Sequence, residues 1–440
     1  MSYSQRLLAR ERATGRPVRV GVVGAGQMGS GLVAQINRVP GLFMSAVADI
    51  DVTRAERALA GAGCDRVTTT DDLTDAAAVI EAGESVAISD GLALTRLPLD
   101  VIVEVSGVPD VAAEVAYASL LAGKDTLLMT VEADVTVGLL LAGMANAGGA
   151  IYSICRGDEP VECLKLIEYA EDIGLEVVVA GKGKNNPNRP TDTPTDVRDE
   201  AIAKGMNPKM LSSFTDGTKT QVEMCALSNA TGYPVDVPGM HGVPCSIDEL
   251  AAKLVPAADG GIIAADGPVV EYVTGNVAPG VFVIVKSGND VVTHELDYLK
   301  LGAGPYYSLY RPYHLASIEA NLSIGEAVVD RRPSFQPTTW TSEVVAVAKT
   351  GLDAGLKLEG IGGHHVHGIA VSASEAVELG TPEQSRVAVG RRKVGWAVAV
   401  GELEALHLGR LARVQNPNTV QDPVVQYRDE KLRQVFDRRA

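Results

Sequence analysis

The fold is inferred first from residues 18–29, which read VRVGVVGAGQMG. Val18 to Val23 form a short β-branched run, which predicts a strand buried on both faces of a parallel sheet. The run continues directly into the turn Gly24-Ala25-Gly26-Gln27-Met28-Gly29, and a helical pattern follows to about Arg38. A glycine-rich turn between a strand and a helix is typical of dinucleotide binding, because its backbone N–H groups face a pyrophosphate at the helix N-terminus.

A second apolar run, Phe43 to Ala48, ends at Asp49, twenty residues beyond Gly29. This spacing strengthens the prediction, since an acid at that point accepts hydrogen bonds from the adenosine ribose of NAD. Arg54 lies close enough in sequence to pair with the 2′-phosphate of NADP, so the preference between the two cofactors stays open.

Further strand and helix units follow. Leu99 to Ser106 is predicted as a strand, Val111 to Ala122 as a helix ended by Gly123, and Thr126 to Val131 as a strand. The alternation predicts a doubly wound dinucleotide-binding α/β domain over roughly residues 17–150. The alternative is a glycine-rich turn that binds no ligand.

Composition and charge exclude several classes of protein. The chain has 440 residues, 46% hydrophobic and 21% charged, which indicates a globular protein of two or three domains. The net charge of −16 argues against binding to nucleic acid or to an anionic membrane. Five scattered cysteines without a CxxC pair indicate a reducing compartment rather than a disulfide framework.

No targeting or membrane-spanning segment is predicted. Residues 1–16 carry four arginines around Leu7 and Leu8 and are expected to form a short amphipathic helix against the first domain. The longest apolar stretch, Val137 to Ile154, contains Asn146 and four glycines, which favours a buried helix followed by a strand. The protein is therefore expected to be soluble and cytoplasmic.

Two lysines follow another predicted strand, Glu176 to Ala180. Lys182 and Lys184 alternate with glycine, and residues 185–189 continue as a polar loop. Exposed backbone with cationic side chains suits a phosphate or a carboxylate, so both lysines are candidate substrate ligands. A solvated polar loop is the alternative.

A predicted helix carries a candidate catalytic lysine. Asp216, Lys219 and Glu223 fall at i, i+3 and i+7, which places them on one helix face, while Val222 and Cys225 indicate burial elsewhere. A lysine held between carboxylates in a dry cleft can polarise a carbonyl or move its proton during hydride transfer. The alternative is an exposed ion pair.

Two more polar segments are candidate ligands. A helix is predicted over Leu315 to Val329, and Pro312 is well placed for its first turn, which puts Arg311 and His314 near the positive end of the helix. Arg311 is a candidate for binding an anion in bidentate fashion, and a capping or interface role is the alternative. The carboxylates of residues 158–159 are candidates for a divalent metal or a substrate hydroxyl.

The last hundred residues are rich in predicted strands and turns. Trp340 to the C-terminus is predicted as a small β domain, with Pro333 to Thr339 as its linker. The run His364-His365-Val366-His367 is not predicted to bind a metal, because no further ligand has suitable spacing.

Several stretches together carry a family resemblance: RPVRVGVVGAG at 16–26, VEADV at 131–135, AGKG at 180–183, GMNP at 205–208, DGTK at 216–219 and LYRPYHL at 309–315. They resemble the 1-deoxy-D-xylulose-5-phosphate reductoisomerase-like (DRL) oxidoreductases, distant relatives of homoserine dehydrogenase. The resemblance implies a Rossmann domain over residues 1–150, an α+β catalytic domain over 151–335 and a β-clip domain of the SAF type over 336–440.

The resemblance also implies an activity. Members reduce or rearrange a small anionic sugar or polyol with NADPH, as when 1-deoxy-D-xylulose 5-phosphate becomes 2-C-methyl-D-erythritol 4-phosphate in isoprenoid biosynthesis. NADH is the other cofactor considered, a divalent metal is compatible but not predicted, and a homo-oligomer is expected. The implied substrate ligands are Lys182, Lys184, Asp216, Lys219, Arg311 and His314. The implied cofactor contacts are Gly24, Gly26, Gln27, Met28, Gly29, Asp49, Arg54, Ser106, Gly107 and Glu132.

Two stretches depart from the related families. Homoserine dehydrogenases carry lysine where this chain has Thr130-Val131-Glu132, which argues against plain homoserine oxidation. The loop from Asn185 to Asp192 differs from that of DRL relatives, so the substrate stays open. The alternatives are a homoserine-dehydrogenase-like or apionate-oxidoisomerase-like enzyme and a non-catalytic dinucleotide-binding sensor.

Overall fold

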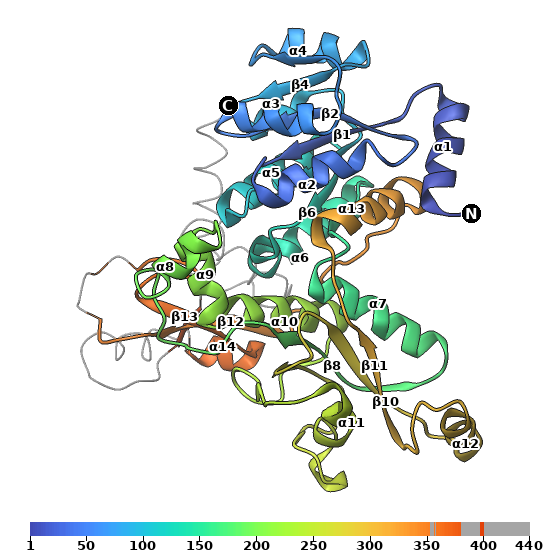
Figure 1. The fold of residues 1–440 in the computed structure, drawn as a ribbon, viewed down its shortest axis with the longest axis vertical. Helices are drawn as coiled ribbons and strands as arrows, with labels where there is room; N and C mark the ends of the chain where they lie inside the picture. The colour runs from blue at the N-terminus through green and yellow to red at the C-terminus, as the bar shows by residue number, and fades with distance from the viewer. Residues whose placement is uncertain (353–355, 357, 380–396, 400–440) are drawn as a thin grey trace, which may run out of the picture.

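The structure is a computed structural model that describes residues 1–352, 356, 358–379 and 397–399 (Figure 1). Its largest sheet has seven parallel strands in the order β3-β4-β2-β1-β5-β6-β7. The strands are β1 (Val18–Val23), β2 (Leu42–Ala48), β3 (Val67–Thr69), β4 (Ser85–Ile88), β5 (Val101–Glu104), β6 (Asp125–Leu128) and β7 (Tyr152–Ile154). The order reverses on either side of β1, which confirms the predicted doubly wound α/β fold.

Helices cover both faces of this sheet, which is the upper part of the molecule in Figure 1. They are α1 (Tyr3–Thr14), α2 (Gln27–Ile36), α3 (Val52–Gly61), α4 (Leu73–Glu81), η1 (Gly91–Arg96), α5 (Pro109–Leu121) and α6 (Val131–Gly148). Val20 and Val22 of β1 are fully buried, as expected of a central parallel strand. The expected strand to Val131 is wrong at its end, because β6 ends at Leu128 and Val131 begins α6.

A second, four-stranded sheet has the order β11-β10-β8-β9. Its strands are β8 (Glu176–Lys184), β9 (Val269–Thr274), β10 (Val281–Lys286) and β11 (Tyr306–Arg311). The buried side chains of α7 (Glu159–Asp172) and α10 (Thr218–Thr231) share one apolar core with this sheet. The remaining helices between β8 and β11 are α8 (Arg198–Ala203), α9 (Pro208–Thr215), η2 (Ile247–Glu249), α11 (Leu250–Lys253), η3 (Ala257–Asp259) and α12 (Asp290–Tyr298).

The chain returns to the first sheet after β11. Helix α13 (Ala316–Gly325), continued by η4 (Glu326–Asp330), packs on α2 and on α1. Arg6 of α1 forms an ion pair with Asp330, and Leu7 is fully buried in the core around β1 and β2. The N-terminal helix therefore contacts both the first sheet and the returning segment.

A third sheet, of order β13-β12-β14, lies against α10 (Figure 1). It consists of β12 (Ser342–Ala348), β13 (Val366–Ser372) and β14 (Ala397–Ala399), with α14 (Ala373–Leu379) beside it. The predicted linker at 333–339 is not a free tether, because Phe335 is buried and its N–H donates to Ser153 Oγ. Most of the region predicted to be SAF-like, residues 336–440, lies outside the described residues.

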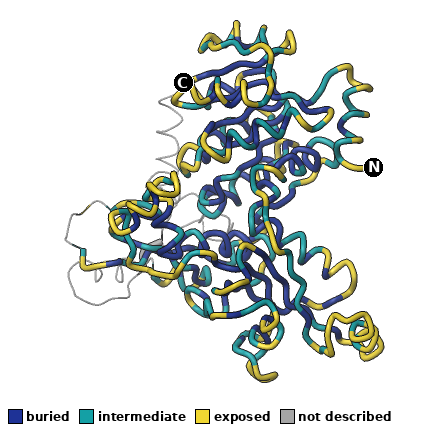
Figure 2. Tube along the Cα trace, viewed as in Figure 1, coloured by how far each residue is buried: buried dark blue, intermediate teal, exposed yellow. Residues whose placement is uncertain are grey.

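Figure 2 shows buried residues along the strands of the two large sheets and exposed residues on the outer helices, α12 above all. In the described part of the chain, no helix combines the length and the hydropathy that crossing a membrane requires. All five cysteines are free.

Candidate active site

The glycine-rich turn after β1 is shaped for close backbone packing. Gly24 has a φ of +103°, and a Cβ there would lie 2.9 Å from the backbone of Ser106. A Cβ on Gly29 would lie 2.0 Å from the carbonyl oxygen of Gly24, so α2 begins directly against the turn. Gly26, the N-cap of α2, faces open space. The turns after β1 and β5 therefore meet, and a ligand can approach the N-terminus of α2.

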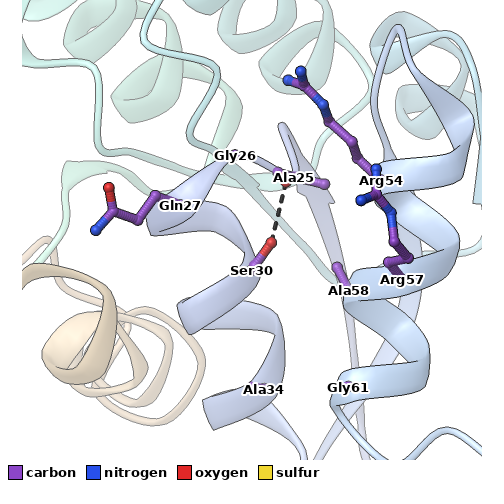
Figure 3. A pocket seen from close by; sticks show the side chains of 9 residues that line it. All are labelled: Ala25, Gly26, Gln27, Ser30, Ala34, Arg54, Arg57, Ala58 and Gly61. Atoms are coloured by element: carbon purple, nitrogen blue, oxygen red, sulfur yellow. Dashed lines mark hydrogen bonds between the residues drawn. The ribbon is translucent and has the colours of Figure 1, made fainter. Parts of the chain in front are cut away.

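A cleft of about 440 Å³ opens between α2 and α3 (Figure 3). Arg54 and Arg57 of α3 line one wall, and Ser30 of α2 donates a hydrogen bond to the carbonyl of Ala25 at 3.1 Å. The lining residues are Ala25, Gly26, Gln27, Ser30, Ala34, Arg54, Arg57, Ala58 and Gly61. Three of the predicted cofactor contacts thus lie around one cleft: Gly26, Gln27 and Arg54.

Asp49 holds the turn in place. Its Oδ2 accepts the N–H of Ala25 at 2.8 Å, and its Oδ1 accepts the N–H of Asp51 at 2.9 Å. Both carboxylate oxygens are therefore engaged by backbone, although each retains a further lone pair. Arg54 lines the cleft and forms a 3.4 Å ion pair with Asp51.

The last residue of β5 carries a carboxyl group that the sequence did not single out. Glu104 is fully buried, and its Oε1 accepts the N–H of Ser106 at 2.7 Å. Burial raises the pKa of Glu104 to about 7. The N–H of Gly107 donates to Thr130 Oγ1 at 3.2 Å, so the predicted contacts Ser106 and Gly107 lie beside the start of α6.

Alternating carboxylates and lysines connect the first sheet with the second. Lys219 Nζ on α10 lies 3.0 Å from Glu132 Oε1 on α6 and 3.8 Å from Glu223 Oε1 one turn along its own helix. Glu223 also accepts a hydrogen bond from Lys182 of β8, whose Nζ donates to Glu159 Oε1 of α7 at 2.7 Å. We call these five residues the ion network.

His314 stands at one end of the ion network. Its Nε2 lies 3.3 Å from Glu159 Oε1, and its Nδ1 lies 3.0 Å from the carbonyl oxygen of Gly157. Both ring nitrogens therefore lie beside oxygen acceptors. The His314 side chain is 25% exposed. At the other end the side chains of Lys219 and Glu132 are 18% and 15% exposed, so both ends of the network reach solvent, while Lys182 between them is 7% exposed.

Burial and ion pairing shift the pKa values of the network residues in opposite directions. Burial lowers the pKa of Lys182, but Glu159 and Glu223 outweigh it and the pKa is raised. Burial is likewise overcome for Lys219, whose pKa is raised chiefly by Glu132 and Glu223. Burial raises the pKa of Glu159, yet Lys182 and His314 together bring it down to about 2. Both lysines are therefore ammonium groups at neutral pH.

The strand β8 brings Lys182 into the network because it is longer than predicted. The expected loop at residues 181–184 is wrong, since β8 extends through Lys184. A Cβ on Gly181 would lie 1.9 Å from the carbonyl oxygen of Glu271, so glycine here lets β9 pair closely. Lys182 and Lys184 are two residues apart in a strand and share one face of the sheet.

Lys184 is engaged by the loop that follows it. Its Nζ donates to the carbonyl oxygens of Asn186 at 2.9 Å, Pro187 at 3.0 Å and Phe214 at 2.7 Å. Burial lowers the pKa of Lys184 to about 8. All three ammonium hydrogens have backbone acceptors, so Lys184 fixes the loop rather than presenting a free cation.

Asp216 is not on the helix face predicted for it. Helix α10 starts at Thr218 after Gly217, which adopts a φ of +90°, so Asp216 precedes the helix. Asp216 Oδ1 accepts the N–H of Thr218 at 2.8 Å, and Oδ2 lies 2.8 Å from Lys349 Nζ. The structure thus separates Asp216 from Lys219 and pairs it with Lys349, which sequence reasoning missed.

Arg311 ends a strand instead of preceding a helix. Pro312 is therefore not in the first turn of a helix, because β11 ends at Arg311 and α13 begins four residues after Pro312, at Ala316. The Arg311 guanidinium forms ion pairs with Glu162 and Glu319. These contacts join α7, β11 and α13.

The cations predicted to bind an anionic substrate instead belong to a charge-balanced site. Lys182 and Lys219 bind carboxylates, Lys184 binds carbonyl oxygens and Arg311 binds two glutamates. Among the described residues, every lysine and arginine predicted as a substrate ligand has such a partner. The physical reason is burial, since a buried ammonium group is stable only with acceptors around it.

The carboxylates of Asp158, Glu159 and Glu223 offer oxygens within 4.8 Å of one another. Such oxygens suit Mg²⁺ or Mn²⁺, but Lys182 already bridges two of the three. As arranged, these residues fit a lysine rather than a metal ion.

One known family model matches part of the chain. Residues 157–320 match the family model described as the catalytic domain of the oxidoreductase DRL, which confirms the predicted resemblance over that segment. None of the curated proteins matches the chain.

Solved structures resemble the chain only at low identity and low TM-score. A putative myo-inositol dehydrogenase from Sinorhizobium meliloti is 11% identical, with a TM-score of 0.41 over 71% of this chain and 89% of its own. A myo-inositol dehydrogenase from Corynebacterium glutamicum is 13% identical, with a TM-score of 0.41 over 72% of this chain and 90% of its own. A probable dehydrogenase from Thermotoga maritima is 13% identical, with a TM-score of 0.40 over 73% and 91%.

Proposed function

Because residues 157–320 match the family model of the DRL oxidoreductase catalytic domain, we propose that the protein is an NAD(P)H-dependent oxidoreductase acting on a carbonyl or hydroxyl group of a small sugar or polyol derivative. The observation that carries the proposal is the contact between Lys219 and Glu132 at 3.0 Å. This contact sets the Lys219 ammonium group, whose side chain is 18% exposed, beside the helix that follows β6 of the first sheet.

The residues of the first sheet fit a dinucleotide. The open N-terminus of α2 at Gly26 suits the pyrophosphate, and the cleft beside Arg54 and Arg57 suits the adenosine end. Two guanidinium groups on that wall, with Asp49 engaged by backbone, favour the 2′-phosphate of NADP over the ribose diol of NAD. When bound, the nicotinamide supplies or accepts the hydride.

Lys219 is the proposed proton donor in the direction of reduction. Its ammonium group polarises the substrate carbonyl and gives a proton to the oxygen as the carbon is reduced. Glu132 and Glu223 fix the position of that ammonium group from two sides. Glu223, Lys182 and Glu159 continue to the partly exposed His314, which supports a route for a replacement proton from solvent.

Cofactor binding and turnover test the proposal separately. We expect NADPH to raise the melting temperature and to change fluorescence on binding, more strongly than NADH at equal concentration. A panel of sugars, sugar acids and polyols, assayed at 340 nm with cofactor, then identifies the substrate class. Cofactor binding without turnover of any panel member would favour the dinucleotide-binding sensor, and absence of cofactor binding would refute both.

A further inference from the structure

We propose that the ion network excludes anions, so that the part of the substrate bound by Lys182 and Lys219 is uncharged and offers hydroxyl or carbonyl oxygens. This inference rests on the proposed function, because it concerns the substrate of the same site. It differs from the small anionic substrate that the sequence led us to expect at these lysines.

The site holds more carboxyl groups than lysines. Two lysines face three glutamates, Glu132, Glu159 and Glu223, at the distances given above. Asp158 adds a fourth carboxyl group, with oxygens within 4.8 Å of those of Glu159 and Glu223. Among the described residues Asp158 has no ion-pair partner, and burial raises its pKa well above the ordinary value. The cluster is therefore neutral or negative before any ligand arrives.

The two carboxylates that pair with Lys182 are largely shielded from solvent. The side chain of Glu223 is 3% exposed and that of Glu159 is 14% exposed. A phosphate that took Lys182 from both glutamates would leave Glu223 only its 3.8 Å contact with Lys219, and Glu159 only its 3.3 Å contact with His314, beside a further anion. Leaving one partner of a buried ion pair uncompensated is strongly unfavourable, so the lysine stays with its own carboxylates.

Uncharged oxygen groups meet no such penalty. A carbonyl oxygen accepts a hydrogen bond from an ammonium group that keeps its carboxylate, and a hydroxyl both accepts from lysine and donates to a carboxylate. Alternating donors and acceptors along the ion network therefore match the adjacent hydroxyls of a polyol. The same pattern suits a ketone beside a hydroxyl.

Inorganic phosphate is the probe for this inference, measured by isothermal titration calorimetry on the full chain saturated with NADPH. Saturation covers the anion-binding turn at Gly26. The wild type is compared with Glu159→Gln/Glu223→Gln, which frees Lys182 while keeping side-chain size, and with the same variant carrying Lys182→Met. Glu168→Gln, at an exposed carboxylate paired with Lys165, is the control for loss of one negative charge.

We expect the wild type and Glu168→Gln to show no phosphate binding that depends on Lys182. The double glutamine variant should gain a phosphate site that Lys182→Met removes, at least about tenfold tighter than any wild-type binding. Circular dichroism reports whether this variant is folded, and Glu159→Gln alone replaces it if it is not.

Two results would overturn the inference. One is Lys182-dependent phosphate binding by the wild type, and the other is a folded glutamine variant that gains no site. Neither result depends on hydride transfer, so failure of this inference is distinguishable from failure of the proposed function, which shows itself as absent cofactor binding or turnover. Were NADPH not to bind, the Lys182→Met comparison would still identify phosphate held at the network.

Discussion

Lys219 and Lys182 are the residues on which the chemistry of the site depends. Lys182 is buried and Lys219 is partly buried, and the charge of each is held by carboxylates from other elements, namely α6 and α7, as well as from α10. Burial lowers the pKa of both lysines, whereas the carboxylates raise it by more, so both stay protonated at neutral pH. A lysine so fixed is suited to donate a hydrogen bond to a carbonyl oxygen at a defined place.

Replacement of Lys219 by methionine tests its role. With a substrate from the panel, we expect Lys219→Met to lower kcat by about 10²- to 10⁴-fold, because the proton donor is lost. NADPH affinity should stay within about twofold of the wild type, since Lys219 is not among the cleft-lining residues. Lys165→Met, a lysine of α7 outside the ion network, is the matched control. Equal loss of activity in both variants would contradict the assignment.

The buried carboxyl group of Asp134 should make the folding stability of the protein depend on pH. It lies inside α6, its Oδ1 accepts the hydroxyl of Tyr152 at 2.7 Å, and burial raises its pKa from the ordinary 3.8 to about 7. The folded state therefore holds its proton more tightly than the unfolded state. Stability from this group is complete below pH 3.8 and is lost as the pH rises toward 7, by up to about 1.4 kcal/mol per pH unit.

Asp134→Asn should remove this dependence, because the amide stays neutral and its oxygen still accepts from Tyr152. We expect the variant to become more stable relative to the wild type as the pH rises from 5 to 8. The measurement is the free energy of unfolding of both proteins by urea denaturation. Asp297→Asn, at an exposed position of α12, should show no such trend. A constant difference across this range would mean that Asp134 is already ionised in the folded protein.

At the scale of elements, local patterns predicted the first sheet well and the second less well. The turn after β1 was predictable because its glycines and the flanking β-branched residues are adjacent in sequence. The extension of β8 through Lys184 was not, because glycine and lysine are poor strand formers and the cause is the approach of β9. Arg311 was misplaced for a similar reason, since its strand pairs with β10.

The glycine-rich turn after β1 can be tested by adding one methyl group at Gly29. Gly29→Ala should disrupt the start of α2, because the added Cβ would lie 2.0 Å from the Gly24 carbonyl oxygen. We expect NADPH affinity to fall at least tenfold, a change of about 1.4 kcal/mol, measured by fluorescence titration. Gly148→Ala, in α6 with no atom within 4 Å of the added Cβ, is the control and should bind NADPH normally. Unchanged affinity in Gly29→Ala would show that this turn does not hold the cofactor.

At the scale of the whole molecule, the third sheet is joined to the catalytic domain by contacts that no local pattern reveals. The N–H of Gly368 donates to Thr218 Oγ1 at 2.8 Å, and the N–H of Ala370 donates to Gln221 Oε1 at 2.8 Å. Both acceptors lie on α10, near Lys219 in sequence. A segment that sequence analysis treated as a separate β domain with a linker therefore packs directly on the helix that carries the proposed proton donor.

Lys349 is the charged part of this connection and gives the last prediction. Its side chain is fully buried, its Nζ lies 2.8 Å from Asp216 Oδ2, and it also donates to the carbonyl oxygens of Asp192 and of Gly363. Lys349→Met leaves the Asp216 carboxylate buried without its cation, which should cost about 3–5 kcal/mol in the free energy of unfolding.

A double-mutant cycle measured by urea denaturation isolates the ion pair from the packing around it. In the Asp216→Asn background, where the carboxylate is neutral and the oxygen that caps Thr218 is kept, we expect Lys349→Met to cost at least about 1.5 kcal/mol less than in the wild type. Lys204→Met, at an exposed ion pair with Glu200, should cost about 0.5 kcal/mol or less in either background. An equal cost of Lys349→Met in both backgrounds would assign its effect to the carbonyl contacts alone, and Asp216 would then not be what joins the third sheet to α10.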